Sequence, residues 1–319
     1  MRKFGFTDMS GLLRGRRGCP PPLLAQCNDK TTLSNVSVMA APVSKETQVT
    51  RTASAPHDSA YLLGASSAER RRLLSQGDLL RDAARQLLGR LALPAPARAI
   101  DVGCGPLGVL DLLSDAVGPS GSVVGLDDNE QMIAWARQSV ARLGLTNVTT
   151  ELGRLSADDG PAFDLAHCRL LLINSADPAA IVSAMAAVTR PGGWIAVQEY
   201  DWATWQCDPP HPAWDALKAV IAPVFGGDVH VGARLPSLLR DAAGCQEVHT
   251  AAHAFYWRPR SPCQRLLLQF AGLFGERLLA GGMDPDTLAT LKSELGAHLA
   301  RPVTVVRESL LVQAWGRRP

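Results

Sequence analysis

The chain has 319 residues, of which 46% are hydrophobic, 19% charged and 5% aromatic, enough apolar material for one large domain or two small ones. This composition excludes a natively disordered chain. The 32 Lys and Arg against 30 Asp and Glu leave a formal net charge of +2, too small for the basic face that nucleic acid binding requires. Since no apolar run approaches the roughly 18 residues that cross a membrane, we expect a soluble protein without nucleic acid or membrane partners.

The seven cysteines are odd in number and scattered, and no two have the Cys-x-x-Cys spacing of a zinc site. We therefore expect no metal and no disulfide framework. Residues 1–27 lack the apolar core and small-residue cleavage site of a secretory signal. A reducing cytoplasm is the compartment that fits best.

The first part of the chain divides into two segments. Residues 1–58 combine a run of three prolines with Ser/Thr-rich patches and show no helical or strand period, which predicts a disordered or leader segment. Leucines then recur at helical spacing over residues 66–93, until Pro94 and Pro96 end the pattern. Residues 59–95 are therefore predicted to form an N-terminal helical cap.

From residue 96 onwards, short apolar runs alternate with helical patterns. Strands are predicted over 97–102, 122–126, 148–151, 163–167 and 194–198, and helices over 108–116, 129–143 and 178–189. This alternation is typical of an α/β, Rossmann-like, doubly wound sheet that is mostly parallel. After Asp201 we expect a strand near 247–255, helices over 261–279 and 285–299, and an antiparallel last strand within 303–315 that closes the sheet edge.

A glycine-rich turn follows the first predicted strand, in the run Asp101-Val102-Gly103-Cys104-Gly105-Pro106-Leu107-Gly108. Glycines at a strand-to-helix turn let a ligand approach the backbone, and the helix N-terminus favours polar or anionic groups. The second strand ends in Asp127-Asp128, where a carboxylate accepts hydrogen bonds from both hydroxyls of a ribose. Together, these features predict a nucleoside-containing cofactor.

The glycine spacing alone does not identify the cofactor, because Gly103, Gly105 and Gly108 also satisfy the dinucleotide pattern G-x-G-x-x-G. Asp101 is the discriminating residue. An acid there would repel a pyrophosphate but suits a ligand whose near end carries an ammonium group. This favours S-adenosylmethionine over NAD or NADP.

At this point the sequence resembles the class I S-adenosylmethionine-dependent methyltransferases, in particular the small-molecule branch of quinone and natural-product methyltransferases. The resemblance spans about Tyr61 to Gly316. It is carried by four runs, which are Ala99–Gly105, Val124–Asp127, Phe163–His167 and Arg190–Trp194.

The resemblance implies a role for each part of the cofactor site. Gly103 and Gly105 would line the methionine end, with Asp127 on the ribose and Met132 along the adenine. Where the family often has an acid that contacts the adenine amine, Gly153 is followed here by Arg154, and the backbone N–H of Leu155 is the expected substitute. The complete expected cofactor set is Asp101, Gly103, Cys104, Gly105, Asp127, Asp128, Met132, Arg154, Leu155, Cys168 (through its carbonyl) and Arg169 (on the carboxylate).

The helical segment at about 260–300 resembles the lid that such enzymes place over the substrate. Most of its apolar stripe is expected to pack on the core, as helical stripes usually do, while a few residues line a pocket. The expected substrate pocket consists of Tyr61, Trp202, Trp205, His230, Phe270 and Phe274. We therefore expect an apolar or aromatic acceptor.

Methyl transfer requires an aligned nucleophile, exclusion of water and, for a hydroxyl or carbon acid, a base. The segment after the fifth strand lies at the carboxyl edge of the sheet, where ligands bind in open α/β folds. Tyr200, Asp201 and His211 are therefore the candidate catalytic residues. Each also has an alternative role, since an acid there can simply pair with a cation and a histidine can stabilise a loop.

The expected function is that of an S-adenosylmethionine-dependent methyltransferase, acting on a small, secondary-metabolite-like acceptor by in-line transfer to carbon, oxygen or nitrogen. Two alternatives stay open. One is an NAD(P)-dependent oxidoreductase with the same glycine turn, and the other is a non-catalytic cofactor-binding protein of the same fold. A homodimer formed through the N-terminal helices is also possible.

Overall fold

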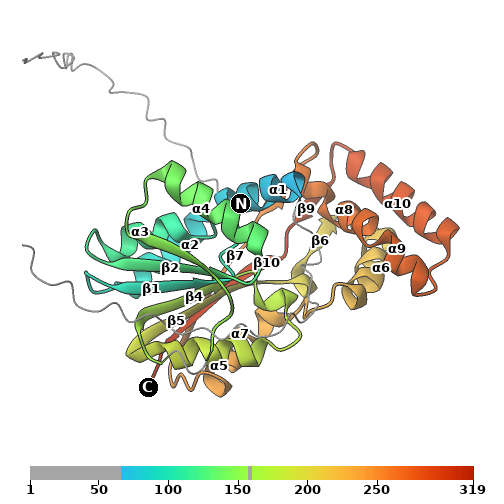
Figure 1. The fold of residues 1–319 in the computed structure, drawn as a ribbon. Helices are drawn as coiled ribbons and strands as arrows, with labels where there is room; N and C mark the ends of the chain where they lie inside the picture. The colour runs from blue at the N-terminus through green and yellow to red at the C-terminus, as the bar shows by residue number, and fades with distance from the viewer. Residues whose placement is uncertain (1–65, 157–159) are drawn as a thin grey trace, which may run out of the picture. The chain divides into compact units, whose positions relative to one another are not determined.

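The computed structural model describes residues 66–156 and 160–319, all of which belong to one compact unit (Figure 1). The predicted leader over 1–58 and the start of the predicted cap, 59–65, lie outside the described residues. Tyr61, expected in the substrate pocket, lies outside them too.

The N-terminal helical pattern forms two helices, α1 (Ser67–Leu79) and α2 (Arg81–Leu91). The Ser66 hydroxyl caps α1 by accepting the backbone N–H of Glu69 at 3.1 Å. The chain bends at Leu80, which separates the two helices. The apolar face of α2, which includes Leu87 and Leu91, is buried against the domain.

The main sheet has seven strands in the order β3-β2-β1-β4-β5-β10-β7. Strands β1 to β5 are parallel, whereas β10 runs antiparallel to both β5 and β7. The predicted, mostly parallel sheet with an antiparallel last strand is thus confirmed. The expected position of the last strand at the edge is wrong, because β7 pairs along its outer side. The strands are β1 (Arg98–Val102), β2 (Ser122–Asp127), β3 (Val148–Leu152), β4 (Phe163–Arg169), β5 (Thr189–Asp201), β7 (Val248–His253) and β10 (Leu310–Arg317).

Helices cover both faces of this sheet (Figure 1). On one face, α2, α3 (Leu110–Val117) and α4 (Glu130–Leu143) pack together and against β1, β2 and β3. On the other, α5 (Pro178–Val188) and α7 (Val231–Asp241) pack against β4, β5 and β10. Alternate side chains of β1 enter the two apolar layers, with Ala99 in one and Ile100 in the other.

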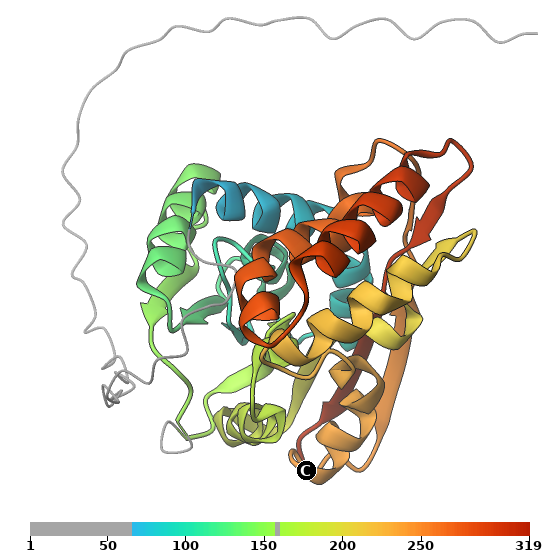
Figure 2. The same cartoon turned by 90° about the vertical axis from the view of Figure 1, so that its right-hand side faces the viewer.

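A second group of helices, which we call the helical lobe, adjoins the carboxyl end of β5. It consists of α6 (Pro212–Ile221), α8 (Leu266–Leu273), α9 (Gly275–Ala280) and α10 (Pro285–Ala300), and α8 and α10 both pack on α6 (Figure 2). A small antiparallel sheet of β6 (Gln206–Asp208), β9 (Val305–Arg307) and β8 (Tyr256–Trp257) lies beside it. The helix predicted over 261–279 is broken at Phe274, and the extended segment over 303–315 is split between β9 and β10 by Glu308 and Ser309.

Among the described residues, helices that are long and apolar enough to cross a membrane are absent.

Candidate functional site

The glycine turn links the end of β1 to the start of α3, as the sequence predicted. Gly105 has φ +55°, and no atom lies within 4 Å of where a Cβ would stand, so its outer side is open. Gly108 has φ +53°, and a Cβ there would lie only 2.5 Å from Asp101 Oδ2. Both positions therefore favour glycine because of their positive φ. At Gly108 a side chain would in addition collide with Asp101.

Asp127 ends β2 beside this turn. Its Oδ2 accepts the Gly105 N–H at 2.8 Å, and its Oδ1 accepts the Asn129 N–H at 3.0 Å. Burial raises the pKa of the carboxyl group to about 6, although both N–H donors act in the opposite direction. Each oxygen keeps a second lone pair, so the carboxylate can still accept bonds from a vicinal diol.

Asp128 and Arg154 form an ion pair on the far side of Asp127, with Nη2 2.6 Å from Oδ2. Met132 and Leu155 line the same part of the cavity. The predicted adenine end is thus framed by an ion pair and two apolar side chains, a setting suited to a flat polar ring.

Arg169, at the end of β4, lies at the opposite side of the turn. Its Nη2 donates to the Gly108 carbonyl at 2.9 Å. Nη1 is buried and has no hydrogen-bond partner within the described part of the chain. Burial lowers the pKa of the guanidinium, yet an arginine stays charged at neutral pH. A buried cation with an unused donor fits a carboxylate ligand.

Two of the expected cofactor residues do not line the cavity. The side chain of Asp101 is almost fully buried, and its Oδ1 lies 2.7 Å from Nδ1 of His167. Cys168 is fully buried within β4, where burial raises the pKa of its thiol. Asp101 therefore supports the turn from behind, while Gly103, Cys104, Gly105, Asp127, Asp128, Met132, Arg154, Leu155 and Arg169 all line the cavity.

The cavity has a volume of about 1070 Å³ and continues from the turn towards the helical lobe. Its far part has aromatic walls. Trp202 stacks on Phe270 with ring centroids 5.8 Å apart and an interplanar angle of 15°, and Trp205 lies 5.2 Å from Trp202. Tyr200 and Phe225 complete this part, which we call the aromatic chamber.

The remaining predicted residues lie outside the cavity lining. Asp201 Oδ1 accepts the Ala203 N–H at 3.0 Å and contacts Nδ1 of His230 at 3.2 Å. His211 caps α6 by accepting the Ala213 N–H. Phe274 packs behind Phe270, with ring centroids 6.1 Å apart. Each of these side chains is engaged in holding a turn or the core, so Tyr200 alone of the predicted catalytic residues faces the cavity.

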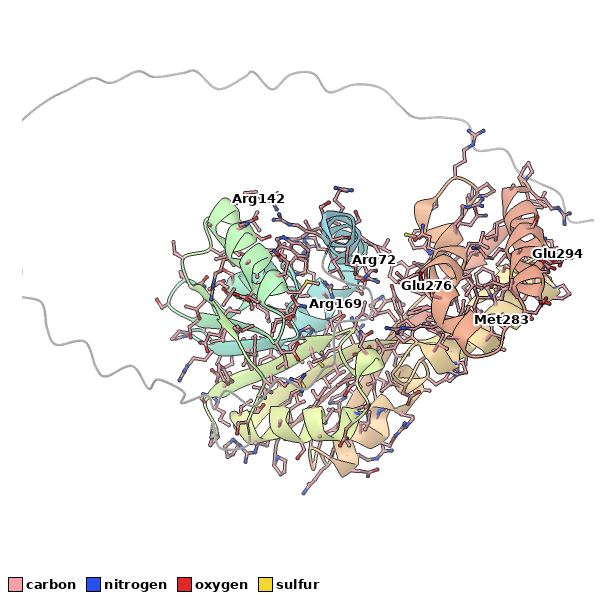
Figure 3. All side chains as sticks on the ribbon, turned by 45° about the vertical axis from the view of Figure 1, so that its right-hand side comes forward. Arg72, Arg142, Arg169, Glu276, Met283 and Glu294 are labelled. Carbon is pink, nitrogen blue, oxygen red and sulfur yellow. The ribbon has the colours of Figure 1, made fainter. Side chains whose placement is uncertain are left out.

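The structure also brings to the cavity residues that we did not predict. Arg72 of α1 and Arg277 of α9 line it, and Arg72 and Arg169 lie between the main sheet and the helical lobe (Figure 3). Glu308, between β9 and β10, is only 4% exposed and lines it as well. In the sequence, Glu308 and Ser309 interrupt the last apolar segment, and this interruption could have marked Glu308 as a candidate site residue. Groups of three or more metal-ligating side chains are absent from the described residues.

An open glycine turn, a ribose-type carboxylate and a buried arginine at the carboxyl end of a doubly wound sheet define a nucleoside-binding α/β protein. Comparison with known proteins makes this class more specific. The methyltransferase domain family matches residues 95–228 of the chain.

Several curated proteins match part of the chain. Trans-aconitate 2-methyltransferase of Variovorax paradoxus is 35% identical over 120 residues, 37% of this chain and 44% of that protein. Demethylmenaquinone methyltransferase of Shouchella clausii is 37% identical over 107 residues, 33% of this chain and 46% of that protein. The chain thus spans less than half the length of these relatives.

Among solved structures, a SAM-dependent methyltransferase from Aquifex aeolicus is 21% identical, with a TM-score of 0.40, over 52% of this chain and 79% of that chain. The fold assignment rests on the strand order and not on this match. Residues 95–228 of the chain are thus similar to a methyltransferase domain, and the curated relatives of part of this chain are methyltransferases by name.

Proposed function

We propose that the protein is a methyltransferase that transfers a methyl group from S-adenosylmethionine to a small, apolar or aromatic acceptor. The observation that carries the proposal is one continuous cavity. It is lined at one end by the glycine turn and Asp127, and at the other by the aromatic chamber. Donor and acceptor can therefore meet in a single cavity, as in-line displacement requires.

The residues at the turn fit S-adenosylmethionine. The open space beside Gly105 lets the cofactor lie against the backbone of the glycine turn. The Asp127 carboxylate accepts hydrogen bonds from the ribose hydroxyls, and the unpaired Nη1 of Arg169 binds the cofactor carboxylate. When bound, the cofactor supplies an electrophilic methyl group on a positively charged sulfur. The chain's own contribution is to orient the two reactants and to exclude water.

The aromatic chamber supports an apolar or aromatic acceptor. Trp202 and Phe270 stack on each other and both line the cavity, and Tyr200, which lies near Arg169, adds a hydroxyl to the lining. The relatives named above act on small molecules according to their names, which agrees with an acceptor of this size.

A thermal-shift series with S-adenosylmethionine, S-adenosylhomocysteine, NAD and NADP tests the proposal. At about 100 times its dissociation constant a specific ligand adds about 2.7 kcal/mol and raises Tm by several degrees. We expect a shift with the first two compounds alone, and a smaller shift in Asp127→Asn. A shift with NAD or NADP alone would identify an oxidoreductase. Cofactor binding without turnover of any acceptor would point to a non-catalytic protein.

Three further expectations from the sequence stay proposals. They are that the acceptor is a secondary metabolite, that the protein works in the cytoplasm, and that it forms homodimers through its N-terminal helices. Size-exclusion chromatography with light scattering tests the last of these.

A further inference from the structure

Glu308 is a buried carboxylate that the cofactor site leaves unexplained. Its Oε1 accepts the Ser309 N–H at 3.0 Å, and its Oε2 accepts Nε1–H of Trp257 at 3.2 Å. It forms no ion pair within the described part of the chain, although it is nearly inaccessible and lines the cavity. Two N–H groups therefore fix the carboxylate, and each oxygen keeps a lone pair for a ligand.

Glu308 lies near Tyr200, and Tyr200 also lies near Arg169. Burial raises the pKa of the Tyr200 hydroxyl, and the nearby Glu308 carboxylate raises it further, while Arg169 acts in the opposite direction. Tyr200 is thus close to both residues. Arg169 in turn donates to the carbonyl of Gly108 in the glycine turn. Glu308, Tyr200 and Arg169 therefore belong to the same part of the cavity lining as the glycine turn.

We propose that Glu308 is the general base of this site, and that the acceptor is a flat ring bearing a weakly acidic hydroxyl, such as a phenol or an enol. This inference rests on the proposed methyltransferase function.

The shape of the chamber favours a flat ring. Trp202 and Phe270 are nearly parallel, and Trp205 meets the second of these rings edge-on at 6.2 Å. The first two rings stack on each other, so it is the joint surface of the three rings that an aromatic acceptor can pack against, with little cost in side-chain entropy. A saturated, strongly hydrated acceptor would gain less from them.

The charges around the cavity favour oxygen over a protonated amine. Arg169 and Arg277 both line it, and neither is paired with a carboxylate in the part of the chain that the structure describes. Arg72, which is paired with Glu69, lines it as well, so that six arginines stand against five carboxylates in the lining. These cations repel an ammonium group and stabilise negative charge that develops on an oxygen.

The step balances without a further reactant. The acceptor O–H bond breaks and its proton moves to a Glu308 oxygen, while the freed oxygen lone pair forms the new C–O bond. The C–S bond breaks with its electron pair going to sulfur, which leaves S-adenosylhomocysteine. Glu308 then releases the proton to solvent.

Two acceptors that differ in their need for a base test this role. The hydroxyl of 2-naphthol, like that of tyrosine, ionises well above neutral pH, whereas 4-nitrophenol is already largely ionised at about pH 8.5. We expect Glu308→Gln to lower kcat for 2-naphthol by about 100-fold, and for 4-nitrophenol by less than about tenfold. Glu308→Asp, which keeps the carboxylate, should recover part of the rate. Equal losses with both acceptors would overturn the role of Glu308 as base.

Binding to the complex with S-adenosylhomocysteine gives a readout without turnover. At about pH 8.5 the ionised Glu308 repels 4-nitrophenolate, so Glu308→Gln should bind this probe several-fold more tightly. The same variant should bind neutral 2-naphthol more weakly, since a hydrogen-bond acceptor is lost. Tyr200 and Cys263 are titratable groups that interact with Glu308, and neither of them is changed in the comparison. Changes in the same direction for both probes would contradict the proposal.

Glu276→Gln is the matched control, because Glu276 is exposed on α9 and does not line the cavity. It should leave both rates and both affinities unchanged. Methylation of aniline-type amines but of neither hydroxyl probe would overturn the acceptor class. If S-adenosylmethionine causes no thermal shift in the unmodified protein, the proposed function itself is refuted.

Discussion

Asp101 and His167 lie on the neighbouring parallel strands β1 and β4, with Oδ1 of the aspartate 2.7 Å from Nδ1 of the histidine. Nε2 of His167 faces the side-chain amide of Gln198 at 2.8 Å, and the amide orientation assigns the His167 proton to Nδ1. Gln313 on β10 donates in turn to Oε1 of Gln198 at 2.8 Å. A buried polar network thus runs across four strands to the residue that starts the glycine turn.

Replacing Gln198 with leucine should destabilise the fold through this network. The change leaves Nε2 of His167 and one N–H of Gln313 without partners in the core, which costs about 1–3 kcal/mol of unfolding free energy. Urea denaturation of the two proteins measures the difference. Gln269→Leu, at an exposed position of α8, is the control. If both variants lose the same amount, the network does not stabilise the protein.

Asp127 should make cofactor binding depend on pH. Because burial raises its pKa to about 6, the carboxyl group gains a proton as pH falls through this value and loses accepting capacity for the ribose. Calorimetry should show S-adenosylmethionine binding more weakly below about pH 6. At neutral pH, Asp127→Asn should weaken binding by about 1–3 kcal/mol and show no such transition.

Glu130→Gln removes a neighbouring exposed carboxylate in the first turn of α4 and serves as the control for this experiment. It should keep both the affinity and the pH transition. A pH transition that persists in Asp127→Asn would assign the titration to another group.

The succession of strands and helices along the chain could be predicted from local patterns. Apolar runs bounded by glycine and proline alternate with helical periods, and each signal lies within a window of about 15 residues. The turn at Gly103 and Gly105 was predictable for a related reason, since backbone approach requires glycine wherever it occurs. Asp127 follows from its place at the end of the second strand.

The aromatic chamber and its acid could be predicted only in part. Glu308 reaches the cavity from 108 positions beyond Tyr200, because β10 returns antiparallel beside β5. The polar break at Glu308 and Ser309 in the last apolar segment is a local signal, but it does not indicate which distant residues Glu308 joins. Asp201 and His211 lie outside the cavity lining for a local reason, since each accepts an N–H from a residue two positions ahead in its own turn.

Glu199 should make the protein less stable as pH rises. Burial raises the pKa of its carboxyl group from 4.5 to about 8, although the backbone N–H of Leu172 donates to Oε1 at 2.6 Å. Between these pH values the unfolded chain releases a proton that the folded protein keeps, so the free energy of unfolding falls with pH over this interval. Glu199→Gln should remove a decline of about 2–4 kcal/mol.

Urea denaturation at about pH 5 and pH 8.5 measures this decline. Glu294→Gln, on the exposed side of α10, is the control and should decline as the unmodified protein does. An equal decline in Glu199→Gln would show that Glu199 is ionised in the folded protein at neutral pH.

Trp257 should tune the base proposed at Glu308. Burial raises the pKa of Glu308 to about 7, and the indole N–H of Trp257 opposes this shift by donating to the carboxylate. Trp257→Phe removes the donor and retains a ring that can stack on Phe255. Since Glu308 must be ionised to accept a proton, the rate rises with pH through its pKa. The acidic limb of the pH–rate profile for 2-naphthol should therefore move to higher pH by about half a pH unit to one pH unit.

Trp194→Phe is the matched control, because the Trp194 indole donates to the carbonyl of Leu91 and does not line the cavity. If the acidic limb does not move in Trp257→Phe, or moves equally in both variants, the limb does not report the ionisation of Glu308.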